Sequence, residues 1–93
     1  MIANQVILRR RLHEKRYING QLAVFLHDEE DRPLAELSIM HNFVELAPNE
    51  FILKDYSENE ELAKELLESK LIHPTNRFIL IGSHLCPICK VAS

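Results

Sequence analysis

The chain has 93 residues, of which 46% are hydrophobic and 27% are charged, as expected for one small globular domain. Its two glycines and four prolines exclude a fibrous chain, and no apolar run approaches the roughly 20 residues that span a bilayer. The apolar residues of the N-terminus precede its charges, the reverse of a secretory signal. We therefore expect a cytoplasmic protein with reduced cysteines.

Charge is unevenly distributed along the chain. The formal net charge is −3, yet residues 1–20 hold five basic side chains and one acidic side chain. Arg9, Arg10 and Arg11 stand together there and form a candidate basic patch. Such a patch can neutralise phosphates, but the chain has no tryptophan and no basic-aromatic platform for single strands. We therefore do not expect direct nucleic-acid binding, and a DNA-contacting accessory factor is kept as an alternative.

A β-hairpin is predicted at Asn19-Gly20, after a stretch with apolar residues at even spacing. Asn-Gly between strands favours a two-residue type I′ turn, because both residues tolerate a positive φ. Opposite charges would then pair across the strands, each pair adding roughly a few tenths of a kcal/mol. These pairs are Arg11 with Asp28, Arg10 with Glu29 and Arg9 with Glu30. A three-residue loop would shift the register by one residue, and this alternative stays open.

Three further strands are predicted before the helix. Residues 22–26 are continuously apolar, which is typical of a central strand buried on both faces. Residues 34–40 alternate apolar and polar side chains, and residues 51–54 form the next strand. The loop 41–49 is expected to place its larger apolar residues under the sheet: Phe43, Val44 and Leu46.

The clearest helix is predicted at about residues 58–71. Ser57 and Glu60 match a capping box, in which each side chain accepts a hydrogen bond from the other residue's backbone amide. Pro74 disfavours helical backbone at His73 and so ends the helix. The apolar stripe of this helix has helical spacing and consists of Leu62, Ala63, Leu66 and Leu67.

Residues 78–81 and 85–91 are the last predicted strands. Pro87 lacks an amide hydrogen, so we place the second of these strands at an edge of the sheet. The order of elements predicts a single α+β domain over residues 1–93: a mainly antiparallel sheet of five to six strands with one helix packed on one face. An exposed sheet edge would offer a surface for a homodimer.

Two cysteines near the C-terminus, Cys86 and Cys89, form a Cys-Pro-x-Cys sequence. Two thiolates in such a turn can bind zinc, and His73 and His84 would complete a set of four ligands. A redox pair is a weaker alternative, because no helix can follow to lower the pKa of the first thiol. The third interpretation, which we favour, is that both cysteines pack as small hydrophobic residues of a strand, with no cofactor.

No catalytic constellation is recognisable, so we do not expect an enzyme. The serines lie in no nucleophile elbow, and with glycine only at positions 20 and 82 there is no phosphate-binding loop. The predicted helix and the residues before it are acidic, and such a face can dock on a basic groove. The candidate partner-binding residues are Asp55, Glu58, Glu61, Glu65 and Glu68.

Several short motifs resemble a family of uncharacterised small proteins carried by phages, plasmids and conjugative elements. The likeness covers about residues 17–91, and its motifs are Asn19-Gly20, 22–24, 33–39, 49–55, Glu58-Asn59 and a terminal strand with cysteine and proline. The resemblance implies an accessory protein of a mobile element. Small acidic proteins of that kind often block host defence complexes, including CRISPR effectors. We therefore expect a non-catalytic inhibitor that acts by protein–protein binding.

Overall fold

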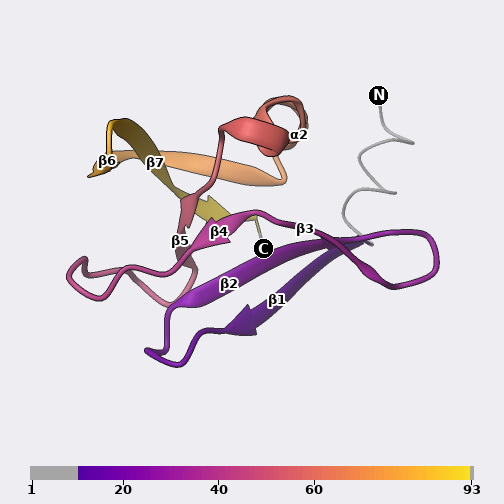
Figure 1. Ribbon diagram of the computed structural model, residues 1–93, viewed down its shortest axis with the longest axis horizontal. Coiled ribbons are helices and arrows are strands. Elements are labelled where there is room, and N and C mark those ends of the chain that lie inside the picture. The colour runs from indigo at the N-terminus through magenta and orange to yellow at the C-terminus, as the bar shows by residue number, and fades with distance from the viewer. Residues whose placement is uncertain (1–10, 93) are drawn as a thin grey trace.

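The computed structural model describes residues 11–92 of the chain (Figure 1). This part forms seven strands, one 3₁₀ helix and one α-helix, with all strand pairs antiparallel. The elements are β1 (Leu12–Arg16), β2 (Leu22–His27), β3 (Pro33–Glu36), β4 (Ser38–Ile39), β5 (Glu50–Leu53), η1 (Ser57–Asn59), α2 (Glu60–Glu68), β6 (Ile72–Ile81) and β7 (His84–Val91).

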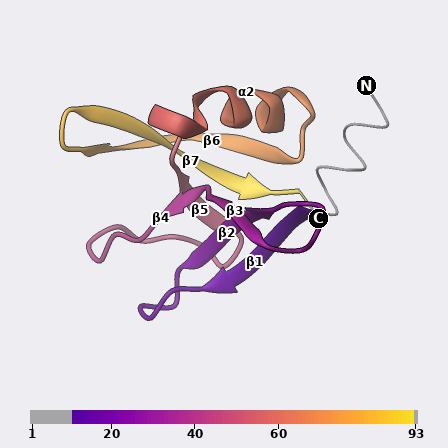
Figure 2. The same cartoon turned by 45° about the vertical axis from the view of Figure 1, so that its right-hand side comes forward.

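The strands form two sheets, whereas the sequence predicted one. The first sheet has the order β1-β2-β3 and the second has the order β4-β5-β7-β6. The α+β class with a single helix is confirmed for the described residues, and α2 lies over the β6–β7 hairpin (Figure 2). None of the helices in residues 11–92 combines the length and hydropathy needed to cross a membrane.

Leu37 connects the two sheets and divides the strand predicted at 34–40. Its N–H donates to the carbonyl of Val24 in β2 at 2.9 Å, and its carbonyl accepts from the N–H of Lys54, after β5, at 2.8 Å. The Leu37 side chain is fully buried. The chain therefore passes from one sheet to the other at a residue that is anchored to both.

The first hairpin has a three-residue loop instead of the predicted two-residue turn. Tyr17 and Gln21 form its closing pair, and Gly20 donates to the Tyr17 carbonyl at 2.8 Å. Only Gly20 of this loop has a positive φ, +88°, which is the conformation of a type I turn followed by a glycine bulge. Arg16 consequently pairs with Leu22, one residue away from the two-residue register. In the observed register Arg11 lies beside His27 and donates from Nε to its carbonyl, while Arg9 and Arg10 lie outside the described residues.

The helix is shorter than predicted and begins without a capping box. A 3₁₀ turn that contains Ser57, with a φ of +55°, precedes α2. The N-cap residue of α2 is Asn59, and its side chain makes no capping hydrogen bond. Asn59 is 1% exposed, and its Nδ2 donates to the carbonyl of Glu36 in β3 at 2.8 Å. A tertiary hydrogen bond to the neighbouring sheet therefore fixes the start of the helix.

The last hairpin, β6–β7, is longer than predicted. His73 and Pro74 lie inside β6, and a bulge between Pro74 and Arg77 interrupts its pairing with β7. β6 is the edge strand, and β7, predicted at the edge, lies between β5 and β6. However, β5 pairs with β7 only as far as Ile88, so Pro87 needs no amide hydrogen on that side.

Two apolar clusters cover opposite faces of the second sheet. The larger cluster joins α2 and β2 to that sheet, and its fully buried members include Leu37, Phe51, Leu53, Leu66 and Cys89. The smaller cluster holds Ile52, Cys86 and Ile88 with the loop residues Val44 and Leu46. Phe43, which was also predicted to lie under the sheet, is 95% exposed.

Candidate functional site

Two of the five residues predicted to form an acidic partner-binding face lie before α2 and are engaged in ion pairs. Glu58 pairs with Lys54 at 2.8 Å, and Asp55 pairs with His84 Nε2 at 2.7 Å. Glu61, Glu65 and Glu68 are exposed on α2 and have no ion-pair partner among residues 11–92. Their spacing puts the three carboxylates on one side of the helix, opposite the buried Ala63 and Leu66. We call Glu61, Glu65 and Glu68 the acidic ridge.

The hairpin β6–β7 has an exposed apolar face that the sequence analysis missed. Leu80 pairs with Leu85 and Phe78 with Pro87, so these side chains share one face. Phe78, Leu80 and Leu85 are 55%, 64% and 55% exposed. The alternate residues, including Ile79 and Ile81, pack into the smaller cluster on the other face. We call Phe78, Leu80 and Leu85 the apolar strip.

The ridge and the strip belong to the same side of the second sheet. Leu85, Pro87 and Cys89 occupy every second position of β7, so their side chains point to the same face of the sheet. Cys89 packs with Leu66 of α2 in the larger cluster, which places α2 on that face. The hairpin extends beyond the end of the helix, so α2 covers only part of this face (Figure 2). A molecule that docks on the uncovered part of this face would meet the apolar strip, while the acidic ridge lies on the outer side of α2, opposite the residues that pack on the sheet.

The four residues of the zinc alternative are not brought together. Cys86 packs in the smaller cluster and Cys89 in the larger one, because residues three apart in a strand point to opposite faces. His84 is engaged with Asp55, and His73 is exposed on β6. Burial, followed by the charge of Asp55, raises the pKa of both thiols, that of Cys89 to about 12. Both cysteines pack as protonated core residues.

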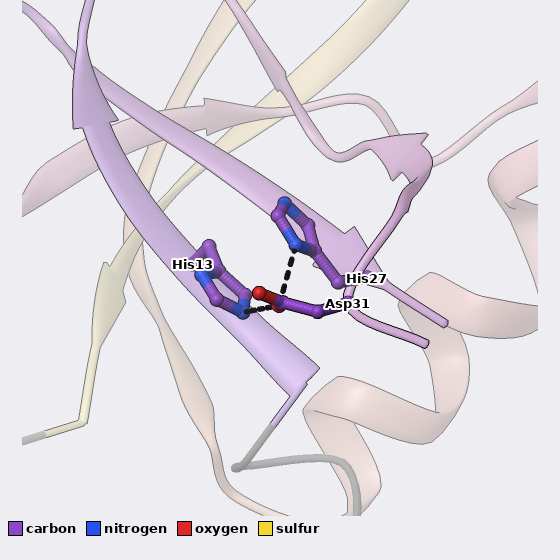
Figure 3. A group of neighbouring side chains, drawn as sticks. All are labelled: His13, His27 and Asp31. Carbon is purple, nitrogen blue, oxygen red and sulfur yellow. Dashed lines mark hydrogen bonds and ion pairs between the residues drawn. The ribbon is translucent and has the colours of Figure 1, made fainter. Parts of the chain in front are cut away.

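A group of two histidines and one aspartate lies on the first sheet. The rings of His13 in β1 and His27 in β2 stack with centroids 3.7 Å apart (Figure 3). Asp31 Oδ1 lies 3.2 Å from His13 Nε2 and 3.1 Å from His27 Nδ1. Among the residues that the structure describes, this is the one set of three such side chains with donor atoms close enough to hold a metal ion.

The buried histidine of this group is incompletely paired. His27 is 7% exposed, and its Nε2 has no hydrogen-bond partner within residues 11–92. The sequence analysis did not group His13 and His27 with Asp31. The signal that identifies them is the hairpin register, which places both rings on one face of β1 and β2.

A shallow hollow of about 480 Å³ lies between the first hairpin loop and the segment before β5. Its charged lining residues are Arg16 and Glu45, and the others are amide, apolar or small residues. This pair offers no recognisable combination of nucleophile and base.

Comparison with known proteins adds no relative: the chain matches no protein-family model, no curated protein and no solved structure.

Proposed function

We propose that this chain is a non-catalytic protein-binding module that docks through the apolar strip and the acidic ridge. The observation that carries the proposal is the exposure of Phe78, Leu80 and Leu85 on a single hairpin face. Scattered apolar residues on a surface are ordinary, but a contiguous apolar face is characteristic of interaction sites.

The charges of the acidic ridge favour a particular kind of partner. Like charges four residues apart destabilise a helix by roughly 0.2–0.5 kcal/mol. Glu61 and Glu65 have this spacing, and neither forms an ion pair with a cationic side chain of residues 11–92. A basic surface would compensate this repulsion on contact and would accelerate association. The proposed partner is therefore a protein with an apolar patch bordered by lysine or arginine.

The resemblance of residues 17–91 to mobile-element proteins suggests where such a partner occurs. A host defence complex that grips nucleic acid, such as a CRISPR effector, presents basic grooves of this kind. In this proposal the chain inhibits the complex in the cytoplasm by occupying a basic groove. A separate proposal is that two copies pair along the free edge of β6, and measurement of mass in solution tests it.

Binding variants test the proposal. One variant carries Leu80→Ser and Leu85→Ser, and a second carries Glu61→Lys and Glu65→Lys; Phe43→Ser is the matched control, since Phe43 is 95% exposed on a different loop. Proteins captured from host lysate are identified by mass spectrometry, and affinity is then measured with the purified partner at several salt concentrations. Both double variants should weaken binding, and Phe43→Ser should not.

The salt series separates the contributions of the two surfaces. Added salt should weaken binding of the native chain, and it should matter less for the Glu61/Glu65 variant, because screening acts on the charges. The proposal is refuted if the Leu80/Leu85 variant binds with native affinity, or if Phe43→Ser abolishes binding equally.

A further inference from the structure

We propose that His13, His27 and Asp31 form a binding site for a divalent transition-metal ion, with zinc as the best-suited ion. The site lies on the β1–β2–β3 sheet, and the inference does not depend on the proposed protein-binding function. It also differs from the zinc set expected from the sequence, because it uses neither cysteine.

Two of the three pairs of donor atoms already have the spacing of metal ligands. In a tetrahedral zinc site with bonds of about 2.05 Å, neighbouring ligand atoms lie roughly 3.3 Å apart. Asp31 Oδ1 lies 3.2 Å from His13 Nε2 and 3.1 Å from His27 Nδ1, and all three donor atoms lie within 4.8 Å of one another. Imidazole nitrogen and carboxylate oxygen are ligands that zinc, cobalt, nickel and copper share.

Two of the three ligands are held in place by the fold. His27 is buried in β2. Asp31 stands in the turn to β3 with a φ of +62°, and its N–H donates to the Asp28 carbonyl at 3.0 Å. Aspartate is one of the few residues that adopt this left-handed conformation readily. The turn therefore directs the carboxylate back towards His27, four residues earlier.

The third ligand has room to adjust. The ring planes of His13 and His27 lie within 12° of each other, so one ion in the plane of both requires one ring to turn. The His13 side chain is 34% exposed and can make this rotation, whereas His27 is enclosed. Asp31 is 77% exposed, which leaves the remaining coordination position open to water.

The surroundings predict a site of moderate affinity. Three acidic residues precede Asp31 in the turn, Asp28, Glu29 and Glu30, and favour a cation, while Arg32 and Arg11 oppose it. When His27 coordinates through Nδ1, its Nε2 carries the proton and finds no acceptor among residues 11–92. A hydrogen-bond acceptor for the second ring nitrogen of a ligating histidine typically raises metal affinity by about 10–100-fold. Because His27 lacks such an acceptor within the described residues, we expect micromolar binding instead of the tight binding of structural zinc sites.

Titration of the full-length, chelator-treated chain with Zn²⁺ alone tests the site. Calorimetry should show one ion per chain, and Co²⁺ should give the visible absorption of a nitrogen- and oxygen-ligated ion without a thiolate charge-transfer band. Asp31→Asn should weaken binding by about tenfold or more while it preserves the turn, because asparagine also tolerates a positive φ. His13→Gln should have the same effect.

His73→Gln is the matched control, because His73 is exposed on β6 outside the group. Circular dichroism of each variant confirms that it is folded. Absence of Zn²⁺ binding by the native chain at millimolar concentration overturns the proposal. Native affinity in both Asp31→Asn and His13→Gln also overturns it, as does binding that is lost in His73→Gln or on replacement of the cysteines by serine.

Discussion

Replacement of Ser38 by alanine tests the junction between the two sheets. Ser38 is 2% exposed, and its Oγ accepts a hydrogen bond from the N–H of Val24 at 2.8 Å. Tyr17 Oη lies 2.8 Å from the same Oγ and is also bonded to the Ser38 carbonyl and to Glu36. Tyr17 therefore retains partners without the hydroxyl, whereas the Val24 amide loses its acceptor in a site that is 1% exposed.

A buried donor without a partner costs about 1–3 kcal/mol, so we expect Ser38→Ala to lower the free energy of unfolding by about 2 kcal/mol. With a urea m-value of about 1 kcal/mol/M, the midpoint of unfolding should fall by about 2 M. Circular dichroism during urea titration measures this shift. Ser83→Ala, at the exposed β6–β7 turn, is the matched control and should change stability by less than about 0.5 kcal/mol. If Ser38→Ala also stays within that limit, the hydroxyl does not hold the junction and the argument fails.

Three further changes probe other parts of the structure. Leu66→Ala should lower the free energy of unfolding, measured by urea titration, by about 2–5 kcal/mol, since Leu66 is fully buried. Leu80→Ala, at a site that is 64% exposed, should change it by less than about 0.5 kcal/mol. Equal effects of the two substitutions would contradict the assigned core. The pKa of Cys89 is raised to about 12 by burial, so at about pH 8 a disulfide reagent should modify the native chain slowly and the urea-unfolded chain rapidly; fast native modification would contradict the burial of both thiols. The pKa of Asp28 is lowered from its ordinary value of 3.8, chiefly because its carboxylate accepts a hydrogen bond from the backbone amide of Arg32. The ionised carboxylate therefore stabilises the fold at a pH above 3.8, and this stabilisation is lost as the pH falls through the lowered pKa. Asp28→Asn should thus destabilise the chain at neutral pH, and the difference from the native chain should close in acid; a difference that persists in acid would rule out the charge as its cause.

The sequence predicted the fold class and most strands, because alternation and continuous apolar runs report burial directly. It did not predict the division into two sheets. Leu37 keeps the alternation of its neighbours while its N–H and carbonyl bond to different sheets, so the side-chain pattern is the same with or without the transfer. The end of α2 was also misplaced. Pro74 correctly excludes helix near His73, but the chain leaves the helix at Glu68 and already belongs to an edge strand at Pro74, where a missing amide is tolerated.

Whether the histidine–aspartate group could be predicted depended on the length of the first hairpin loop, where a difference of one residue decides the outcome. With a two-residue turn, His13 would lie opposite Leu26, and the adjacent His27 would point to the other face of the sheet. The three-residue loop places His13 opposite Phe25, so that His27, two residues further along β2, shares its face. The same shift brings Arg11 beside His27 instead of Asp28 and removes the ladder of charge pairs that favoured the shorter turn. Charge pairs contribute only about a few tenths of a kcal/mol each, which is too little to determine the register when another register buries Leu22, Val24 and Leu26 on the core face. The glycine bulge at Gly20 permits the register that this burial requires.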